Sequence, residues 1–211
     1  MPLLSVTDGS GTVLALDSYD EFGIPGTANV GRFQYTGQAW LPELGLPVYL
    51  YNMPSLTKVS FGRESLRRAM QLPSVVGLKD SSGDLAYFRE AVRLASARSD
   101  SSVFMGPETL LAEALLLGAQ GGVPGGANLA PWLFVELYEA FHRGDSARAR
   151  ELQDRVVRIS STVYAVGKHG SAYLKGLKCA LSLVGPCDDF LAEPFTRFGA
   201  PDRRRVEEHL L

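Results

Sequence analysis

The sequence predicts an α/β protein with a parallel sheet, preceded by a short β-rich segment and followed by a helical tail. After Leu46, short apolar runs alternate with helical patterns, which indicates repeated βαβ units. Residues 1–46 are instead rich in Gly, Thr, Tyr and Asp and lack a helical period. Beyond Gly144 only helical patterns follow. These three sequence patterns predict a division of the chain into residues 1–46, 47–143 and 144–211.

The first segment is expected to form β-hairpins. A Gly-rich turn at residues 8–11 (DGSG) precedes a short apolar run around Val13 and Leu16, and the breaker GIPG at residues 23–26 closes that run. Turn residues between short apolar runs are typical of hairpins.

Four apolar runs are expected to form the parallel sheet. Each is short, is bounded by turn residues and is followed by a helical pattern. The runs are Pro47–Tyr51, Val75–Lys79, Val103–Met105 and Gly121–Val123.

Helices are expected after each strand and throughout the tail, where apolar residues recur at helical spacing. A proline at a helix start is tolerated, so Pro131 is expected to open one of them. The predicted helices are Arg63–Leu72, Leu85–Leu94, Thr109–Leu117, a helix from Pro131 through Phe141, Ala147–Val166, Ser171–Leu183 and a short helix after Pro201.

The composition argues against several classes of function. The chain is 45% apolar and 21% charged with a formal net charge of −2, which is typical of soluble globular proteins. The densest basic run, residues 203–205, is followed at once by acidic residues, so no nucleic-acid surface is expected. The chain has no run of 18 apolar residues and no signal-peptide pattern, which predicts no membrane partner and a cytoplasmic location.

Neither metal nor disulfide chemistry is expected. The three histidines, His142, His169 and His209, lie far apart without Cys or acidic residues at ligand spacing, so we predict no metal. Cys179 and Cys187 are the only cysteines and are expected to be free thiols.

Two ionisable side chains end the first two predicted strands, Tyr51 and Lys79. Polar residues at the carboxyl ends of parallel strands face the active site of such folds. Neighbouring strands lie about 4.8 Å apart, so a tyrosine hydroxyl and a lysine amine can meet at one small molecule. The lysine follows an apolar run, where burial favours the neutral amine that attacks a ketone.

Both residues also have a structural interpretation. Lys79 can reach the rim of the sheet or pair with Asp80, and Tyr51 can be a hydrogen-bonded core tyrosine. Spacing alone leaves these alternatives open.

Three motifs, LYNMPS at residues 50–55, GLKDSSGD at 77–84 and GAQGGVPGGAN at 118–128, resemble the dihydrodipicolinate synthase/N-acetylneuraminate lyase family over about residues 47–211. The resemblance implies a partial TIM (β/α)8 barrel, made of the four C-terminal βα units and the helical tail. It implies a class I aldolase in which Lys79 forms an imine with pyruvate or another 2-keto acid, Tyr51 relays protons and Val123 offers a backbone contact. The protonated imine itself withdraws electrons, so no cofactor is expected.

Departures from the family pattern bear on the substrate. Family members that condense pyruvate with aspartate semialdehyde usually carry an arginine in YNxPxR, and Leu56 stands there. Leucine cannot hold a carboxylate, which favours cleavage of a sugar-acid-like 2-keto acid. Glu108 resembles a carboxylate that holds substrate hydroxyls, although an acid favoured at a helix N-terminus is the alternative. The glycines of residues 121–126 are expected to allow close backbone approach to the pyruvate site rather than to bind phosphate.

A second resemblance falls on the first segment. The motifs YD at residues 19–20, GRF at 31–33 and YTGQ at 35–38 resemble the Rhs/YD-repeat core, a β-rich shell built from many stacked repeats. One isolated copy can bury little of its apolar face, so a poorly anchored hairpin is the alternative. A toxin with such a shell is disfavoured because the sequence after this segment shows no set of catalytic residues typical of a nuclease or a protease.

Four strands make up half of an eight-stranded barrel. The family's GxxGE loop and paired Ser/Thr, which bind the pyruvate carboxylate, are not found in residues 1–46, so we expect a truncated chain of doubtful activity alone, joined near Leu46–Pro47. An open half barrel has two free edges and an apolar inner face, which favours a homo-oligomer. The alternative is a non-catalytic fusion remnant or interaction protein.

Overall fold

The computed structural model describes residues 3–7, 10, 12–18 and 46–210. The chain divides into two units, residues 1–48 with 72–74 and residues 49–71 with 75–211. In the first unit, strand β1 (Leu3–Thr7) pairs antiparallel with β2 (Val13–Ser18), and the register shifts between Val6 and Thr7. Residues 8, 9 and 11 of the predicted turn, the GIPG breaker and the Rhs-like motifs lie outside the described residues.

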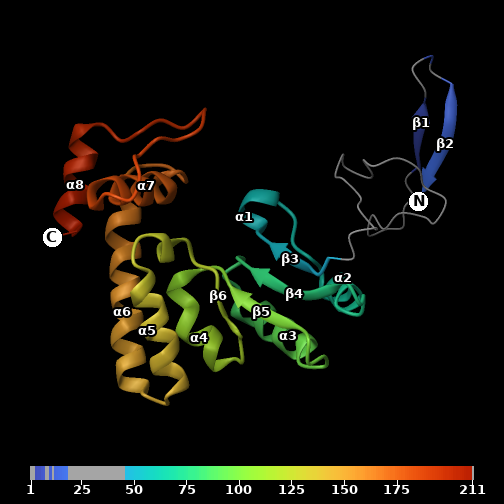
Figure 1. Cartoon of the computed structure of the whole chain (residues 1–211), viewed down its shortest axis with the longest axis horizontal. Coiled ribbons are helices and arrows are strands. Elements are labelled where there is room, and N and C mark those ends of the chain that lie inside the picture. The colour runs from blue at the N-terminus through green and yellow to red at the C-terminus, as the bar shows by residue number, and fades with distance from the viewer. Residues whose placement is uncertain (1–2, 8–9, 11, 19–45, 211) are drawn as a thin grey trace. The chain divides into compact units, whose positions relative to one another are not determined.

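The second unit is built on a four-stranded sheet, as the alternating pattern predicted (Figure 1). Its order β3-β4-β5-β6 follows the chain, and β4–β5 and β5–β6 pair in parallel. The parallel α/β class is therefore confirmed. The strands are β3 (Val48–Asn52), β4 (Val75–Asp80), β5 (Ser102–Met105) and β6 (Gly121–Gly122).

Helices α2, α3 and α4 pack against the sheet because each buries apolar residues, whereas α1 buries none. Helix α3 begins where the Asp84 side chain accepts hydrogen bonds from the backbone N–H groups of Ala86 and Tyr87, and it buries Phe88 and Ala91. The connecting elements are α1 (Pro54–Thr57), α2 (Arg63–Ala69), α3 (Leu85–Ala95), the 3₁₀-helix η3 (Glu108–Leu110), α4 (Leu111–Leu116) and the 3₁₀-helix η4 (Gly125–Asn128).

The expected helical tail is present. Pro131 stands in the first turn of its helix, as predicted. The elements of the tail are α5 (Pro131–His142), α6 (Ser146–Thr162), η5 (Val163–Ala165), α7 (Ala172–Val184) and α8 (Ala200–Leu210). Two apolar clusters hold the unit together: one includes Leu78, Val103 and Leu137 among the sheet and its helices, and the other includes Leu177 and Val206 in the tail.

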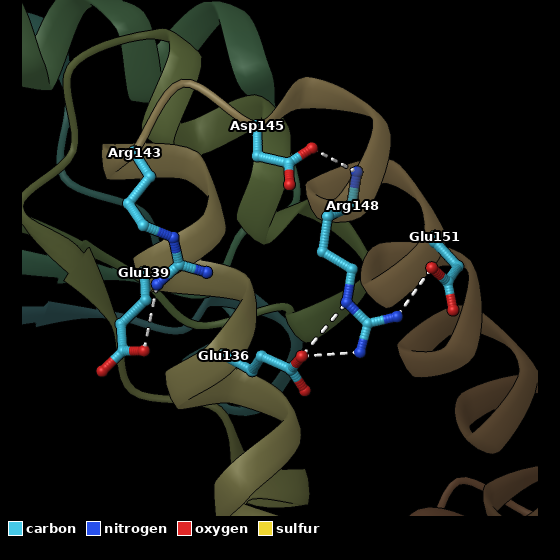
Figure 2. Close-up of polar contacts among 6 residues, drawn as sticks. All are labelled: Glu136, Glu139, Arg143, Asp145, Arg148 and Glu151. Atoms are coloured by element: carbon cyan, nitrogen blue, oxygen red, sulfur yellow. Dashed lines mark hydrogen bonds and ion pairs between the residues drawn. The ribbon is translucent and has the colours of Figure 1, made fainter.

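Polar contacts fix the turn between α5 and α6 (Figure 2). Asp145 caps α6 by accepting a hydrogen bond from the backbone N–H of Arg148. The Arg148 guanidinium lies 2.6 Å from Glu136 of α5 and 2.6 Å from Glu151 of α6. Arg148 therefore joins the two helices, whereas Arg143 pairs with Glu139 within α5.

Some element boundaries differ from those predicted. The predicted helix 147–166 is α-helical only to Thr162 and continues as η5. Thr162 Oγ1 donates to the Arg158 carbonyl oxygen, and Gly176 of α7 approaches the Val163 carbonyl too closely to allow a side chain. The last turn therefore tightens where α7 packs on it. The short helices α1 and η4 have no counterpart in the sequence prediction.

Strands β3 and β6 are the edges of the described sheet. Closure into a barrel stays a prediction. Within the described ranges, none of the helices has the length and apolar character needed to span a membrane.

Candidate active site

The carboxyl ends of the four strands lie along one edge of the sheet. The backbone N–H of the residue after β4, β5 or β6 donates a hydrogen bond to the last residue of the strand before it. Ser81 N donates to the Asn52 carbonyl at 2.7 Å, Gly106 N to the Asp80 carbonyl at 2.8 Å, and Val123 N to the Met105 carbonyl at 2.8 Å. In parallel sheets this edge is the usual place for a ligand.

A cavity of about 530 Å³ opens at this edge. All four residues that the sequence singled out, Lys79, Tyr51, Val123 and Glu108, line it. The other lining residues are Met53, Ser81, Gly106, Pro107, Thr109, Pro124, Gly125, Asn128, Ser160 and Tyr173.

Lys79 and Tyr51 are in direct contact. The Lys79 Nζ lies 4.3 Å from the centroid of the Tyr51 ring. The Tyr51 hydroxyl accepts a hydrogen bond from Ser81 Oγ at 3.4 Å and donates to Met53 Sδ at 3.3 Å. Tyr51 is 50% exposed, so it is not a core tyrosine. The two candidate reactive groups therefore share one wall of the cavity.

Asp80 is not the partner of Lys79. Successive side chains of a strand point to opposite faces, and the Asp80 carboxylate lies buried on the other face of β4. It accepts hydrogen bonds from Asn52 Nδ2 at 2.7 Å and from Ser82 Oγ at 2.8 Å. Burial raises the pKa of Asp80, and these hydrogen bonds oppose the rise.

Glu108 is buried, with 7% of its surface exposed. Its Oε2 accepts a hydrogen bond from Gly126 N at 2.8 Å, whereas Oε1 has no hydrogen-bond partner among the described residues. Burial raises the pKa of Glu108, and the Gly126 N–H opposes the rise. Glu108 is thus the first residue of η3, but its carboxyl group reaches across to η4, and Oε1 is buried there without a hydrogen-bond partner among the described residues.

Two tyrosines of the tail, which sequence reasoning missed, complete this side of the site. The rings of Tyr164 and Tyr173 are 4.9 Å apart at 75°, and Tyr173 lines the cavity. Burial raises the pKa of Tyr173 to about 12, with smaller effects from Glu108 and Tyr51. The Tyr164 hydroxyl is buried without a hydrogen-bond partner in the described part of the chain, and burial raises its pKa as well.

The glycines of the β6–η4 segment make room for neighbouring side chains. A Cβ on Gly122 would lie 2.7 Å from Leu111 Cδ1, and one on Gly125 would meet the Tyr173 hydroxyl. A Cβ on Gly126 would lie 2.6 Å from Glu108 Oε2. The close approaches found here are to side chains, whereas the expected approach to pyruvate stays a prediction.

The described residues contain no group of three or more His, Cys, Asp or Glu side chains that could hold a metal ion. The polar groups of the lining residues are a lysine amine, tyrosine, serine and threonine hydroxyls, an asparagine amide and one buried carboxyl group.

Comparisons with known proteins identify relatives of this chain. The model of the dihydrodipicolinate synthetase family matches residues 28–210. The match therefore begins within the segment that was predicted to be Rhs-like. An uncharacterised DapA-like lyase of Halobacterium salinarum is 33% identical over 189 residues, which cover 90% of this chain and 58% of that protein. A 4-hydroxy-tetrahydrodipicolinate synthase of Archaeoglobus fulgidus is 33% identical over 64% of this chain and 45% of its own length.

Solved structures of related proteins share the fold. The dihydrodipicolinate synthase of Bacteroides thetaiotaomicron is 48% identical, with a TM-score of 0.76 over 80% of this chain and 57% of its own. YagE, a prophage protein of the dihydrodipicolinic acid synthase family from E. coli K12 solved in complex with pyruvate, is 26% identical, with a TM-score of 0.71 over 78% of this chain and 55% of its own. The chain spans about half the length of the relatives that it matches. It belongs to the dihydrodipicolinate synthetase family.

Proposed function

We propose that this chain carries the Schiff-base centre of a class I aldolase that acts on pyruvate or a sugar-acid-like 2-keto acid. The observation that carries the proposal is the contact of the Lys79 amine with the Tyr51 ring, 4.3 Å from Nζ to the centroid, in a cavity at the carboxyl edge of the sheet. A lysine at a strand end, beside a hydroxyl that can move protons, is the arrangement that imine formation needs.

The reaction begins when the neutral Lys79 amine attacks the keto carbon and forms a carbinolamine. Protons move through the Tyr51 hydroxyl, water leaves, and a protonated imine remains. The imine withdraws electrons, so when the hydroxyl on C4 of the keto acid loses its proton, the C3–C4 bond breaks, an aldehyde leaves and an enamine stays on Lys79. Protonation of the enamine at C3 and hydrolysis of the imine then release pyruvate and the Lys79 amine, and the same steps run in reverse for bond formation. Ser81 donates to the Tyr51 hydroxyl and so orients it for this transfer.

The substrate class rests on three further residues. Val123 lines the cavity and is proposed to offer a backbone contact to the keto acid. Glu108 also lines the cavity, and its carboxyl group is proposed to accept hydrogen bonds from substrate hydroxyls. Leu56 stands where synthases of the family usually carry an arginine, and a leucine cannot hold the carboxylate of aspartate semialdehyde. This set favours a hydroxylated keto acid over aspartate semialdehyde.

The active form is proposed to involve a second copy of the chain. Edge strands present unpaired backbone groups, and β3 and β6 are both edges of the described sheet. Pairing across these edges would give a homo-oligomer and enclose the inner face that carries Tyr51. The cytoplasmic location and the Rhs-like nature of residues 1–46 stay predictions.

Borohydride trapping tests the proposal. Incubation with pyruvate and sodium borohydride should reduce the imine to a stable adduct, which peptide mass spectrometry should locate on Lys79. Lys175→Arg is a matched control because this lysine lies outside the cavity, and it should trap normally, whereas Lys79→Arg should not. A folded wild-type protein without an adduct on Lys79 would refute the proposal.

The second candidate function is a non-catalytic interaction protein, which the exposed edges of the sheet favour. It predicts that Lys79→Arg leaves every property of the chain unchanged, including self-association. Sedimentation of the wild type and the variant at several concentrations, together with trapping, separates the two candidates.

A further inference from the structure

We propose that Asn52 and Asp80 are positioning residues that hold Tyr51 over Lys79, an inference that rests on the proposed function. Each of the two follows one reactive candidate in the chain: Asn52 follows Tyr51, and Asp80 follows Lys79. They meet on the far side of the sheet from the cavity, where Asn52 is 1% and Asp80 0% exposed.

The contact between them is short and well supported. Asn52 Nδ2 donates to Asp80 Oδ1 at 2.7 Å. The other end of the Asn52 amide is also fixed, because its Oδ1 accepts from Ser60 Oγ at 2.9 Å and from Phe61 N at 3.3 Å. The Asp80 carboxylate also accepts two hydrogen bonds from Ser82, one from its backbone N–H at 3.2 Å and one from its hydroxyl at 2.8 Å. The two side chains therefore have little rotational freedom.

The hydrogen-bonded side chains of Asn52 and Asp80, called the clamp below, act on Tyr51 and Lys79 through the backbone. Neighbouring residues of a strand point to opposite faces, so fixing Asn52 against Asp80 also fixes where Tyr51 and Lys79 emerge on the cavity face. The backbone bond from Ser81 N to the Asn52 carbonyl joins the strands at the same level. Register and rotation of the two strand ends are thus set beneath the reactive groups.

Stability alone is a poor explanation for the pair. A buried carboxylate loses its hydration, and apolar residues of similar volume often serve a protein core as well or better. Hydrogen bonds differ from apolar contacts in being directional, so they specify one arrangement of the strand ends. Reactive groups need such precision because a displacement of about 1 Å can lower a rate about 10²-fold.

The position of Lys79 can be measured without catalysis. Reductive methylation with ¹³C-formaldehyde labels the five lysines of the chain, and the Lys79 signal is identified by its loss in Lys79→Arg. Above the face of the Tyr51 ring, these methyl groups should be shifted upfield by the ring current. Asn52→Leu should move the Lys79 signal towards that of an exposed lysine. Asp80→Asn should keep the shift, because its Oδ1 still accepts from Asn52 and its Nδ2 can donate to Ser82 Oγ.

Kinetics then test whether the clamp acts through Tyr51. Asn52→Leu should slow trapping of pyruvate on Lys79 about 10²-fold, whereas the conservative variant Asp80→Asn should keep most of the wild-type rate. In a Tyr51→Phe background, Asn52→Leu should cost far less, because the group that it positions is already gone. Leu137→Ala, in the core and outside the cavity, controls for loss of stability and should leave the Lys79 methyl shift in place.

The outcomes are distinct. An unchanged methyl shift in folded Asn52→Leu, or an equal loss of rate with and without the Tyr51 hydroxyl, would overturn the positioning role. A wild-type protein with the shifted methyl signal but no pyruvate adduct would instead overturn the proposed function and leave the clamp in place.

Discussion

Replacing Gly126 by alanine should destabilise the protein, because the space beside Gly126 is filled by a buried carboxyl group. An added Cβ would lie 2.6 Å from Glu108 Oε2, 2.9 Å from Oε1 and 2.9 Å from the Tyr164 hydroxyl. A Cβ this close to another heavy atom, under 3.0 Å, fits only if one of the two atoms moves. The Glu108 carboxyl group can move away only by breaking its 2.8 Å hydrogen bond with the N–H of Gly126. Glu108 and Tyr164 are both buried, so neither side chain can turn easily into solvent.

The size of the effect follows from this displacement. Overpacking of a filled site costs about 1–3 kcal/mol, and loss of a hydrogen bond by a buried group lies in the same range. We therefore expect Gly126→Ala to lower the free energy of unfolding by about 2 kcal/mol, measured by urea unfolding with unchanged m-value.

Two variants make the test specific. Gly170→Ala is the matched control, because a Cβ there meets nothing within 4 Å, and it should be neutral or slightly stabilising. In a Glu108→Ala background the new methyl group has room, so the cost of Gly126→Ala should shrink. Equal costs in both backgrounds, or a Gly126→Ala protein as stable as Gly170→Ala, would show that the carboxyl group does not fill this space.

Two further predictions concern one helix cap and one tyrosine. Asp84→Ala should lower the free energy of unfolding by about 1 kcal/mol in urea titrations, because two N–H groups at the start of α3 lose their acceptor; an unchanged midpoint would contradict the capping role. Tyr173 has a folded-state pKa of about 12, above the ordinary 10.0, so its contribution to stability is full below pH 10 and is lost as the pH rises to about 12. Tyr173→Phe should therefore lose less stability than the wild type between pH 9 and pH 11.5, and parallel losses would contradict the raised pKa.

Much of the second unit could be read directly from the chain. The strand that carries Lys79 and the helix that begins at Pro131 were predicted because apolar periodicity and proline geometry are local properties. Lys79 and Tyr51 could also be placed together, since the carboxyl ends of neighbouring parallel strands must lie at one edge. Recognisable motifs then supplied the family, which the match over residues 28–210 confirmed.

Other features of the site depend on contacts between distant parts of the chain. Nothing in the sequence around Tyr173 indicates that α7 brings its hydroxyl to the cavity, and the partner of the buried Asp80 lies 28 residues away. Glu108 shows the same limit, because its sequence position fitted both a helix start and a ligand contact.

The sequence by itself determined the class of fold, the order of its elements and which side chains stand at the strand ends. Only the tertiary structure decided how those side chains are held: Asp80 against Asn52, Glu108 against Gly126 and Tyr164 beside Tyr173. The physical reason is range. Periodicity and capping act within a few residues, whereas burial, hydrogen-bond pairing and the pKa values that depend on them are set by neighbours that only folding brings together.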